Sequence, residues 1–430
     1  MIDKYFNISE RGSSYRKEII GGLTTFLTMA YIIFVNPNIL GDAGMDKNAL
    51  ITVTILASVI GTLLAGVWAK VPYAMAPGMG LNAFFTYTLV LGAGVEWQTA
   101  LGVVFISGVI FLALTVTGIR TKIIHTIPLG LRLATGAGIG LFISFIGFKN
   151  MGLVVANPAT FVGLGEFTPT LIIGLVGLII TAILEVIKVR GGIFYGIILT
   201  TIIALIFGHV QTPETFVSMP PSISPLAFKL DVVSALSFGL IGAIFSFMFV
   251  DLFDSVGTIV ACSYEAGFVD KDGKVEHVNR ILEADAVATV AGSLLGTSTT
   301  TTYIESAAGI ANGAKTGFAS VITAAFFLLA LFFAPLIGIV PGYATAPALV
   351  IVGVYMFKNI KQINFTDFTE SIPAFLTIIL MPLTYSISIG LSFGFISYVI
   401  LKTIVGKFEE ISWLMWIIAA LSVLNLVLGV

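Results

Sequence analysis

The chain has 430 residues, of which 57% are hydrophobic and only 10% are charged, and its mean hydropathy is +1.05. A soluble domain carries roughly a quarter charged residues, so water cannot be the solvent for most of this surface. The formal net charge of -2 gives no basis for a nucleic-acid partner. The composition therefore predicts a protein whose main partner is the lipid bilayer and which crosses it several times.

The residue types that enzymatic or metal chemistry needs are scarce. Cys262 is the single cysteine, which excludes an internal disulfide, and the histidines are dispersed at His125, His209 and His277. The glycine run GAGIG at 136–140 lies in an apolar stretch and indicates close helix packing rather than a phosphate loop. We expect no enzyme, no cofactor and no metal site.

Apolar stretches of about 20 residues, the length of a bilayer-spanning helix, follow one another along the chain. The first half predicts seven segments, at 18–40, 49–69, 73–92, 98–117, 127–147, 170–187 and 192–209. After a polar, Pro-rich loop around 210–230, the second half predicts seven more, at 234–262, 281–297, 300–314, 317–338, 344–357, 371–388 and 389–405. A last apolar stretch, 412–430, either spans the bilayer or lies in its interface.

The positive charges test this count, because cytoplasmic loops are enriched in lysine and arginine. With a cytoplasmic N-terminus, 17 of the 21 fall on the inner side: Lys4, Arg11, Arg16, Lys17, Lys70, Arg120, Lys122, Lys188, Arg190, Lys271, Lys274, Arg280, Lys315, Lys358, Lys361, Lys402 and Lys407. Only Lys47, Lys149 and Lys229 fall outside, and Arg132 lies within a span. The polar residues 1–17 show no signal peptide, so a multi-pass protein of the cell membrane is predicted.

Seven segments per half place the two halves in opposite orientations, so any repeat must be inverted. Two weak internal similarities agree with this arrangement. Residues 134–150 resemble 344–360, and residues 192–206 resemble 390–404. These similarities occur in the same order, at the fifth and seventh segments of each half.

The third segment of each half is the least helical. In the first half, Pro77 removes a helix hydrogen bond, and the glycines Gly78 and Gly80 lower helix stability. In the second half, the run TTTTY at 299–303 favours an extended strand. Paired interruptions of this kind are the best sequence indication of a transporter's binding site, although kinks that serve only packing would look similar. We expect two short paired strands, each leading into a half-helix whose amides face a cavity.

Acidic side chains within apolar segments are the strongest functional signal. Asp251 and Asp254 lie three residues apart in the eighth segment and share a helix face, and Glu305 opens the half-helix of the tenth. Each carboxylate near a bilayer centre costs at least about 2.5–3.5 kcal/mol, so it must face a polar cavity or find a partner. Arg132 and Lys315 are the only candidate cations near these acids. Such acids can bind and release a proton, although Asp251 fits a structural cap equally well.

Two further acids, Glu283 and Asp285, lie near the cytoplasmic start of the ninth segment. Anchoring at the membrane interface is the expected role of both. Asn82 offers a hydrogen-bond donor and an acceptor, the combination needed to bind the edge of a nitrogen heterocycle.

Five stretches of the chain carry a resemblance to a known family: EIIGGLTTFLTMAYIIFVNPNIL (18–40), APGMGLNAFFTY (76–87), FVDLFDSVGTI (249–259), TSTTTTYIESAAGI (297–310) and IPAFLTIILMPLTYSI (372–387). They resemble the nucleobase–cation symporter family of xanthine and uracil permeases. The resemblance is greatest to its azaguanine-type branch, the adenine/hypoxanthine/guanine permeases. It extends over nearly the whole chain.

The resemblance implies an all-α polytopic fold of 14 transmembrane segments, built as a 7+7 inverted repeat with short strands in segments three and ten. A core domain would comprise residues 18–117 (spans one to four) and 234–338 (spans eight to eleven). A gate domain would comprise residues 127–209 (spans five to seven) and 344–405 (spans twelve to fourteen), with 412–430 as a C-terminal apolar segment.

The resemblance also implies a binding site between the two strands. The substrate would lie against Asn82, Asp254, Glu305, Phe84, Ile304 and Thr302, with backbone amides near Phe84 and Ile304 bonding to its acceptor atoms. In the uracil and xanthine branch, a glutamate is typical at the position of Asp254. The shorter aspartate leaves room for a bicyclic purine.

The function predicted from these features is proton-coupled uptake of adenine, guanine and hypoxanthine by alternating access. The proton-coupling residues would be Glu305, Asp254 and Asp251. The alternatives are a uracil/xanthine permease or an anion transporter of the same fold. A channel or structural membrane protein without a transport cycle is a further alternative. The sequence leaves open whether Na⁺ replaces the proton and whether the chain forms a homodimer.

Overall fold

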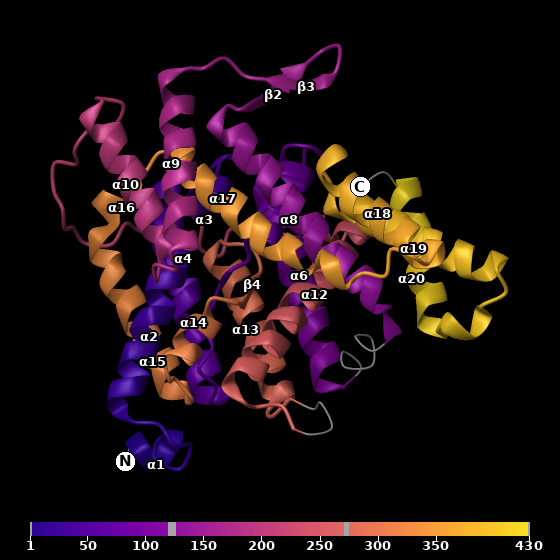
Figure 1. Ribbon diagram of the computed structural model, residues 1–430, viewed down its shortest axis with the longest axis horizontal. Coiled ribbons are helices and arrows are strands. Elements are labelled where there is room, and N and C mark those ends of the chain that lie inside the picture. Colours follow the sequence, from indigo (N-terminus) through magenta and orange to yellow (C-terminus); the bar gives the residue numbers. More distant parts are fainter. Residues whose placement is uncertain (1, 119–125, 271–274, 429–430) are drawn as a thin grey trace.

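The computed structural model describes residues 2–118, 126–270 and 275–428, and it is mostly helical (Figure 1). In this described part, nine helices are long and apolar enough to cross a membrane: Tyr15–Gly41, Lys47–Trp68, Trp97–Val116, Leu129–Met151, Pro169–Val186, Ile241–Ala266, Gly317–Gly338, Gly342–Gln362 and Ile387–Ile404. Shorter apolar helices occupy Met79–Val90, Gly192–Ile206, Phe368–Thr384 and Trp413–Val427. These helices fit the multi-pass membrane protein that the composition predicts.

The helices of the first half are α1 (Ile2–Phe6), α2 (Tyr15–Met29), α3 (Ile32–Gly41), α4 (Lys47–Leu63), α5 (Met79–Ala83), α6 (Trp97–Val116), α8 (Leu129–Met151), α9 (Pro169–Val186) and α10 (Gly192–Ile206). Those of the second half are α11 (Val232–Ala235), α12 (Ile241–Ala266), α13 (Val278–Leu295), α14 (Ser306–Ala311), α15 (Gly317–Ala330), α16 (Ala334–Gly338), α17 (Gly342–Phe357), α18 (Phe368–Leu383), α19 (Ile387–Ile404) and α20 (Trp413–Leu428). The π-helical turns η1 (Leu64–Trp68) and η2 (Phe84–Val90) extend α4 and α5.

Two short strands pair in the interior of the bundle. Strand β1 (Met75–Pro77) lies in the third predicted segment and β4 (Thr300–Thr302) lies in the tenth. They are antiparallel, with Met75 opposite Thr302 and Pro77 opposite Thr300, and both strands are buried. Short helices follow each strand, α5 after β1 and α14 after β4. Each of these segments is therefore split into a strand and a half-helix.

A second strand pair lies outside the helical bundle, at the top of Figure 1. Strands β2 (Val154–Asn157) and β3 (Phe161–Leu164) form an antiparallel hairpin that the sequence analysis did not predict. The turn is built by Asn157, whose Oδ1 accepts hydrogen bonds from the amides of Ala159 (2.8 Å) and Thr160 (3.2 Å). Most of the hairpin's side chains are exposed.

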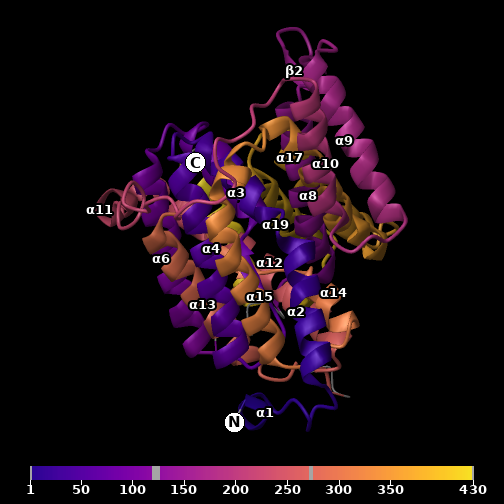
Figure 2. The same ribbon diagram turned by 90° about the vertical axis from the view of Figure 1, so that its left-hand side faces the viewer.

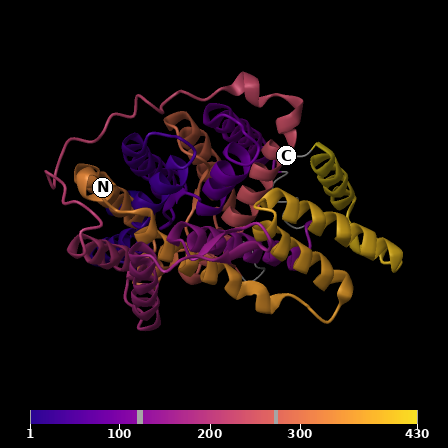
Figure 3. The ribbon, with the colours of Figure 1, turned by 90° about the horizontal axis from the view of Figure 1, so that it is seen from above.

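Two groups of helices pack mainly among themselves. In the first group, α2 and α4 pack on α15, and α6 packs on α12 and α13. In the second group, α8 packs on α17 and α18, and α17 packs on α9 and α10. Figures 2 and 3 show the second group lying along one side of the first. Each group combines helices from both halves of the chain.

The closest packing in the second group joins α8 to α17 through two glycines. A β carbon added at Gly353 would lie 2.3 Å from the carbonyl oxygen of Gly140, and one added at Gly140 would lie 2.7 Å from that of Gly353. Any larger side chain would push the helices apart. Small residues permit the close backbone contact that drives helix association in a bilayer.

A buried carboxylate joins two helices of the first group. Glu18, on α2, accepts hydrogen bonds from the backbone amides of Lys315 (2.9 Å), Thr316 (3.3 Å) and Ala319 (3.2 Å) at the start of α15. The first amides of a helix lack carbonyl partners in a preceding turn, and a negative charge is favourable at a helix N-terminus. Glu18 therefore fixes the end of α15 against α2.

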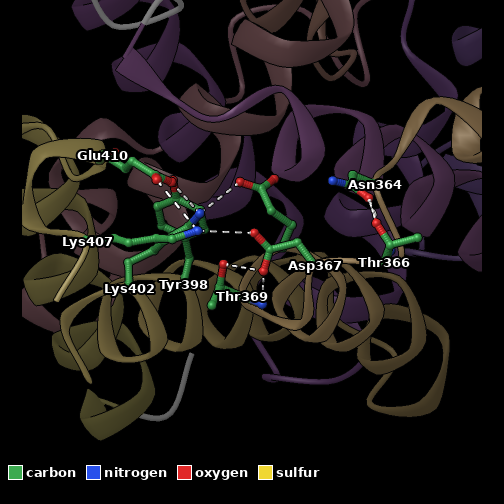
Figure 4. Close-up of polar contacts among 9 residues, drawn as sticks. Asn364, Thr366, Asp367, Thr369, Tyr398, Lys402, Lys407 and Glu410 are labelled. Atoms are coloured by element: carbon green, nitrogen blue, oxygen red, sulfur yellow. Dashed lines mark hydrogen bonds and ion pairs between the residues drawn. The ribbon is translucent and has the colours of Figure 1, made fainter. Parts of the chain in front are cut away.

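A cluster of charged residues joins α18, α19 and the turn η6 (Phe408–Glu410) (Figure 4). The Lys402 ammonium is only 1% exposed and lies 3.2 Å from Glu370 and 2.5 Å from Glu410. Lys407 is 44% exposed and lies 3.5 Å from Asp367. The hydrogen bond from Lys402 holds the pKa of Glu410 below its usual range. This ion pair therefore stabilises the fold at neutral pH and is lost when the pH falls through that lowered pKa.

The burial of Lys402 gives a stability prediction. Lys402→Met should lower the free energy of unfolding by about 1–3 kcal/mol, because two carboxylates lose a buried charged donor. Lys407→Met should change it by no more than about 0.5–1 kcal/mol, because its ion pairs are solvated. Thermal unfolding of the purified protein in detergent measures both. Equal effects of the two substitutions would contradict the role given to burial.

Candidate functional site

A cavity of about 680 Å³ lies beside the strand pair, between the two groups of helices. Its wall in the first group comes from the ends of β1 and β4 and from α12, and its wall in the second group comes from α8 and α17. Leu129 at the start of α8, Tyr264 near the end of α12 and Gln362 line its outer part. In the predicted topology, all three lie at the end of the bundle that also holds the N-terminus.

The strand pair forms a rigid floor for this cavity. Beyond the strands, the Gly78 amide donates to the carbonyl of Thr299 (2.9 Å) and the Tyr303 amide donates to that of Ala74 (2.9 Å). The Tyr303 hydroxyl donates to the carbonyl of Pro77 (2.6 Å). A β carbon at Gly78 would lie 2.9 Å from Cγ2 of Thr301, so only glycine fits there without a shift.

Glu305 lies at the inner end of the cavity, as the residue immediately before α14. Its side chain is half-buried and accepts a hydrogen bond from the hydroxyl of Tyr31, which is completely buried. The Thr28 hydroxyl lies 3.4 Å from the backbone carbonyl of Glu305. The sequence analysis missed Tyr31, because nothing in an apolar stretch indicates which tyrosine faces the interior.

Asp254, on α12, lines the same cavity as Glu305. A β carbon at Gly78 would lie 3.7 Å from Asp254 Oδ2, which places this carboxylate against the turn between β1 and α5. Thr302 and Ile304 also line the cavity, so four of the six predicted binding residues meet there.

The other two predicted binding residues, Asn82 and Phe84, are not among the residues that line the cavity. The Asn82 amide nitrogen donates to Asn36 Oδ1 (2.6 Å), and its oxygen accepts a hydrogen bond from the hydroxyl of Ser298. Phe84 packs on Phe247, with ring centroids 4.9 Å apart. In this structure, both side chains contact protein behind the strand pair.

A second acidic network lies behind strand β4. The Ser255 hydroxyl lies 2.7 Å from Asp285 Oδ2 and 3.2 Å from Asp251 Oδ1, and the Thr302 amide donates to Asp285 Oδ1 (3.1 Å). Asp251 is 3% exposed and Asp285 is completely buried. The predicted interfacial role of Asp285 is therefore wrong. Its neighbour Glu283 does lie near the surface, where it accepts a hydrogen bond from Trp68 Nε1 (3.2 Å).

The sequence analysis named Arg132 and Lys315 as candidate cations for these acids. Arg132 lines the cavity, and its buried Nε has no hydrogen-bond partner. The backbone of Lys315 instead bonds to Glu18. Among the residues that the structure describes, no lysine or arginine forms an ion pair with Asp254 or Glu305. The same residues contain no group of three or more acidic, histidine or cysteine side chains that could hold a metal ion.

A cavity of about 680 Å³ between two groups of helices, with two acids on one wall, is the arrangement expected of a membrane carrier. The chain matches the model of the permease family (Xan_ur_permease) over residues 16–421, and it belongs to that family. It is therefore a transport protein and not an enzyme. The family resemblance drawn from the five sequence stretches is confirmed.

Three permeases match this chain over nearly the whole length of both proteins. A putative permease of Methanocaldococcus jannaschii is 51% identical, over 99% of this chain and 98% of its own. The guanine/hypoxanthine permease PbuG of Bacillus subtilis is 45% identical, over 96% of both chains. The adenine permease AdeP of Escherichia coli is 42% identical, over 99% of this chain and 96% of its own.

Solved structures share the fold at low sequence identity. The transmembrane domain of the cyanobacterial bicarbonate transporter BicA superposes with a TM-score of 0.67 at 15% identity, over 88% of this chain and 97% of that domain. Murine Slc26a9, an anion transporter in its inward-facing state, gives a TM-score of 0.62 at 12% identity, over 90% of this chain and 69% of its own. At such identities the likeness shows the fold alone.

The hydrogen bond from Tyr31 to Glu305 gives a second stability prediction. Tyr31→Phe should lower the free energy of unfolding by about 1–3 kcal/mol, because the half-buried carboxylate of Glu305 loses its hydroxyl donor. Tyr343→Phe is the matched control, since the buried hydroxyl of Tyr343 has no hydrogen-bond partner. Its removal should be neutral or slightly stabilising. Thermal unfolding curves that coincide for the two variants would show that the Tyr31 bond contributes nothing.

Proposed function

We propose that the chain is a secondary active transporter that takes up the purine nucleobases adenine, guanine and hypoxanthine together with protons. The observation that carries the proposal is that Asp254 and Glu305 face one cavity, and that no lysine or arginine in the described part of the chain forms an ion pair with them. The adenine and guanine/hypoxanthine permeases among its relatives support the substrate class.

The chemistry of the cavity suits a purine. A carboxylate accepts two hydrogen bonds on one edge, which matches the adjacent N–H donors of a purine ring. The ring faces would contact the apolar lining, which includes Ile139, Ile143 and Phe253. Thr302 and the chain around Ile304 would border the base on its strand side. Asn82 would act by holding α5 to its neighbours, because its amide bonds to Asn36 and Ser298.

The same acids supply the coupling. An acid without a cation partner can bind a proton in the cavity on one side of the membrane and release it on the other. Proton transfer across the membrane can in this way be linked to the transfer of the bound base. Glu305 and Asp254 would take this role directly, and Asp251 would support them from behind β4 through Ser255. The proton is proposed as the coupling ion in preference to Na⁺.

The two helix groups provide the moving parts. The first group would be the core domain (spans one to four and eight to eleven of a 7+7 inverted repeat), and the second would be the gate domain (spans five to seven and twelve to fourteen). Their packing supports this division, since each group is tied mainly to itself. Movement of the core against the gate would expose the cavity on alternate sides of the membrane. The cavity's outer residues Leu129 and Gln362 would face the cytoplasm, together with the N-terminus.

An anion transporter of the same fold is the second candidate. The solved structures with this fold include anion transporters, but their likeness extends only to the fold. Asp254 and Glu305 would repel an anion that entered the cavity. The acids therefore favour a neutral base over an anion.

Uptake measurements in a permease-deficient cell test the proposal. Radiolabelled adenine, guanine or hypoxanthine should accumulate, and accumulation should cease when an uncoupler collapses the proton gradient. Replacement of external Na⁺ by K⁺ should have no effect. Uptake that survives the uncoupler would remove the proton from the mechanism, and sulfate or chloride uptake above base uptake would favour the anion transporter.

Substitutions should distinguish the roles of the two cavity acids from that of Asn82, which lies behind the strand pair. Asp254→Asn and Glu305→Gln should each abolish uptake at normal expression, because the amide cannot carry the proton. Asn82→Ala should reduce apparent affinity by about tenfold, which corresponds to one lost polar interaction of about 1.4 kcal/mol. Saturation curves of uptake measure all three. Wild-type rates in Glu305→Gln would contradict the role of that acid.

A further inference from the structure

A tyrosine of the second helix group connects the cavity to a third carboxylate, which lies outside the cavity lining. Tyr355, on α17, lines the cavity, and its hydroxyl donates a hydrogen bond to Glu185 Oε2, on the last turn of α9. Tyr355 is 44% exposed and Glu185 is half-buried, so neither side chain is fully enclosed by protein. Neither residue was a candidate in the sequence analysis.

The position of Glu185 is fixed by the start of α10. A β carbon added at Gly192, the first residue of that helix, would lie 2.6 Å from Glu185 Oε1. One carboxylate oxygen therefore lies against a helix N-terminus while the other binds Tyr355. Glu185 Oε2 is thus held in place as the acceptor of the Tyr355 hydroxyl.

The cavity connects this pair with Glu305. Tyr355 and Glu305 both line it, and its volume of about 680 Å³ holds many water molecules at about 30 Å³ each. A continuous hydrogen-bonded path from Glu305 through cavity water to Tyr355 and Glu185 fits this space.

We propose that Tyr355 and Glu185 form the proton-release path of the carrier, which rests on the proton symport proposed above. Glu305 gives its proton to the Tyr355 oxygen, directly or through water, while the Tyr355 hydroxyl proton passes to Glu185 Oε2. Glu305 is left as a carboxylate, Tyr355 is unchanged, and Glu185 becomes the neutral acid. Glu185 then loses the proton to the adjacent solvent, and no oxidant or other reactant is needed.

The path joins two parts that the proposed cycle moves against each other. Glu305 belongs to the first helix group, whereas α9 and α17 belong to the second. The transfer is therefore possible only in the arrangement that brings these groups together, which is the arrangement in this structure. Such a dependence would stop the proton from leaking through when the site faces the other side.

The experiment compares proton-driven uptake with base exchange in proteoliposomes. Exchange of labelled for unlabelled base needs no net proton release, because the loaded carrier can return with its proton bound. Tyr355→Phe and Glu185→Gln should each reduce uptake driven by a pH gradient by about tenfold or more, the effect expected of a lost proton-transfer group. Exchange should stay within about twofold of wild type, since the binding acids are intact.

Matched controls lie on α17 and in the residues just before α9. Tyr343→Phe removes a hydroxyl without a hydrogen-bond partner from α17, and Glu166→Gln removes an exposed carboxylate just before α9. Both should leave uptake and exchange unchanged. A pH-sensitive dye trapped in the vesicles should report base-dependent proton entry in wild type and in the controls, and little in Tyr355→Phe or Glu185→Gln.

Three outcomes would overturn the inference. Unchanged gradient-driven uptake in both variants would remove the two residues from the proton path. Uptake and exchange that fall together would assign them to binding or folding instead. Base uptake by wild type without any proton entry would refute the symport itself, and this outcome is recognised before the variants are compared.

Discussion

Backbone hydrogen bonding in the interior of a membrane protein is the constraint on which this structure depends. An unpaired amide or carbonyl group in hydrocarbon costs several kcal/mol, so a helix can stop at that depth only where other partners exist. Two segments are extended there, at Met75–Pro77 and Thr300–Thr302, and β1 and β4 supply the missing partners to each other. Because the strands are paired, the half-helices that follow them have fixed starting points, and Glu305 has a fixed position beside the cavity.

The acids inside the bundle are placed by a similar constraint. A carboxylate in a bilayer segment is retained where it meets a polar cavity or a network of donors, and both situations occur here. Glu305 and Asp254 face the cavity, whereas Asp285 is bonded to Ser255 and to the Thr302 amide behind β4. The buried acid thus holds the strand, and the strand in turn positions the acids that face the cavity. Removal of either layer would disturb the other.

The sequence predicted the parts of this site that depend on local properties. Proline, glycine and β-branched residues weaken a helix wherever they occur, so the two interrupted segments could be found without coordinates. The direction of a side chain could not be found in this way. Asp285 and Glu283 are two residues apart on α13, yet one is buried in the network and the other bonds to Trp68 near the surface. Asn82 likewise faces protein, because its amide donates a hydrogen bond to Asn36 and accepts one from Ser298.

The contact between Tyr355 and Glu185 joins residues 170 positions apart, so no pattern along the chain could indicate it. Its significance comes from where the two helix groups meet. Acids on one helix group could exchange protons with solvent at any time. They cannot do so freely if the proton must pass through residues of the other helix group. A carrier that places Glu305 on one part and its proton acceptor on the other makes proton transfer depend on their relative position. In the proposed cycle the coupling would follow from the geometry that gives access to the base, because one movement would open the cavity and complete the path.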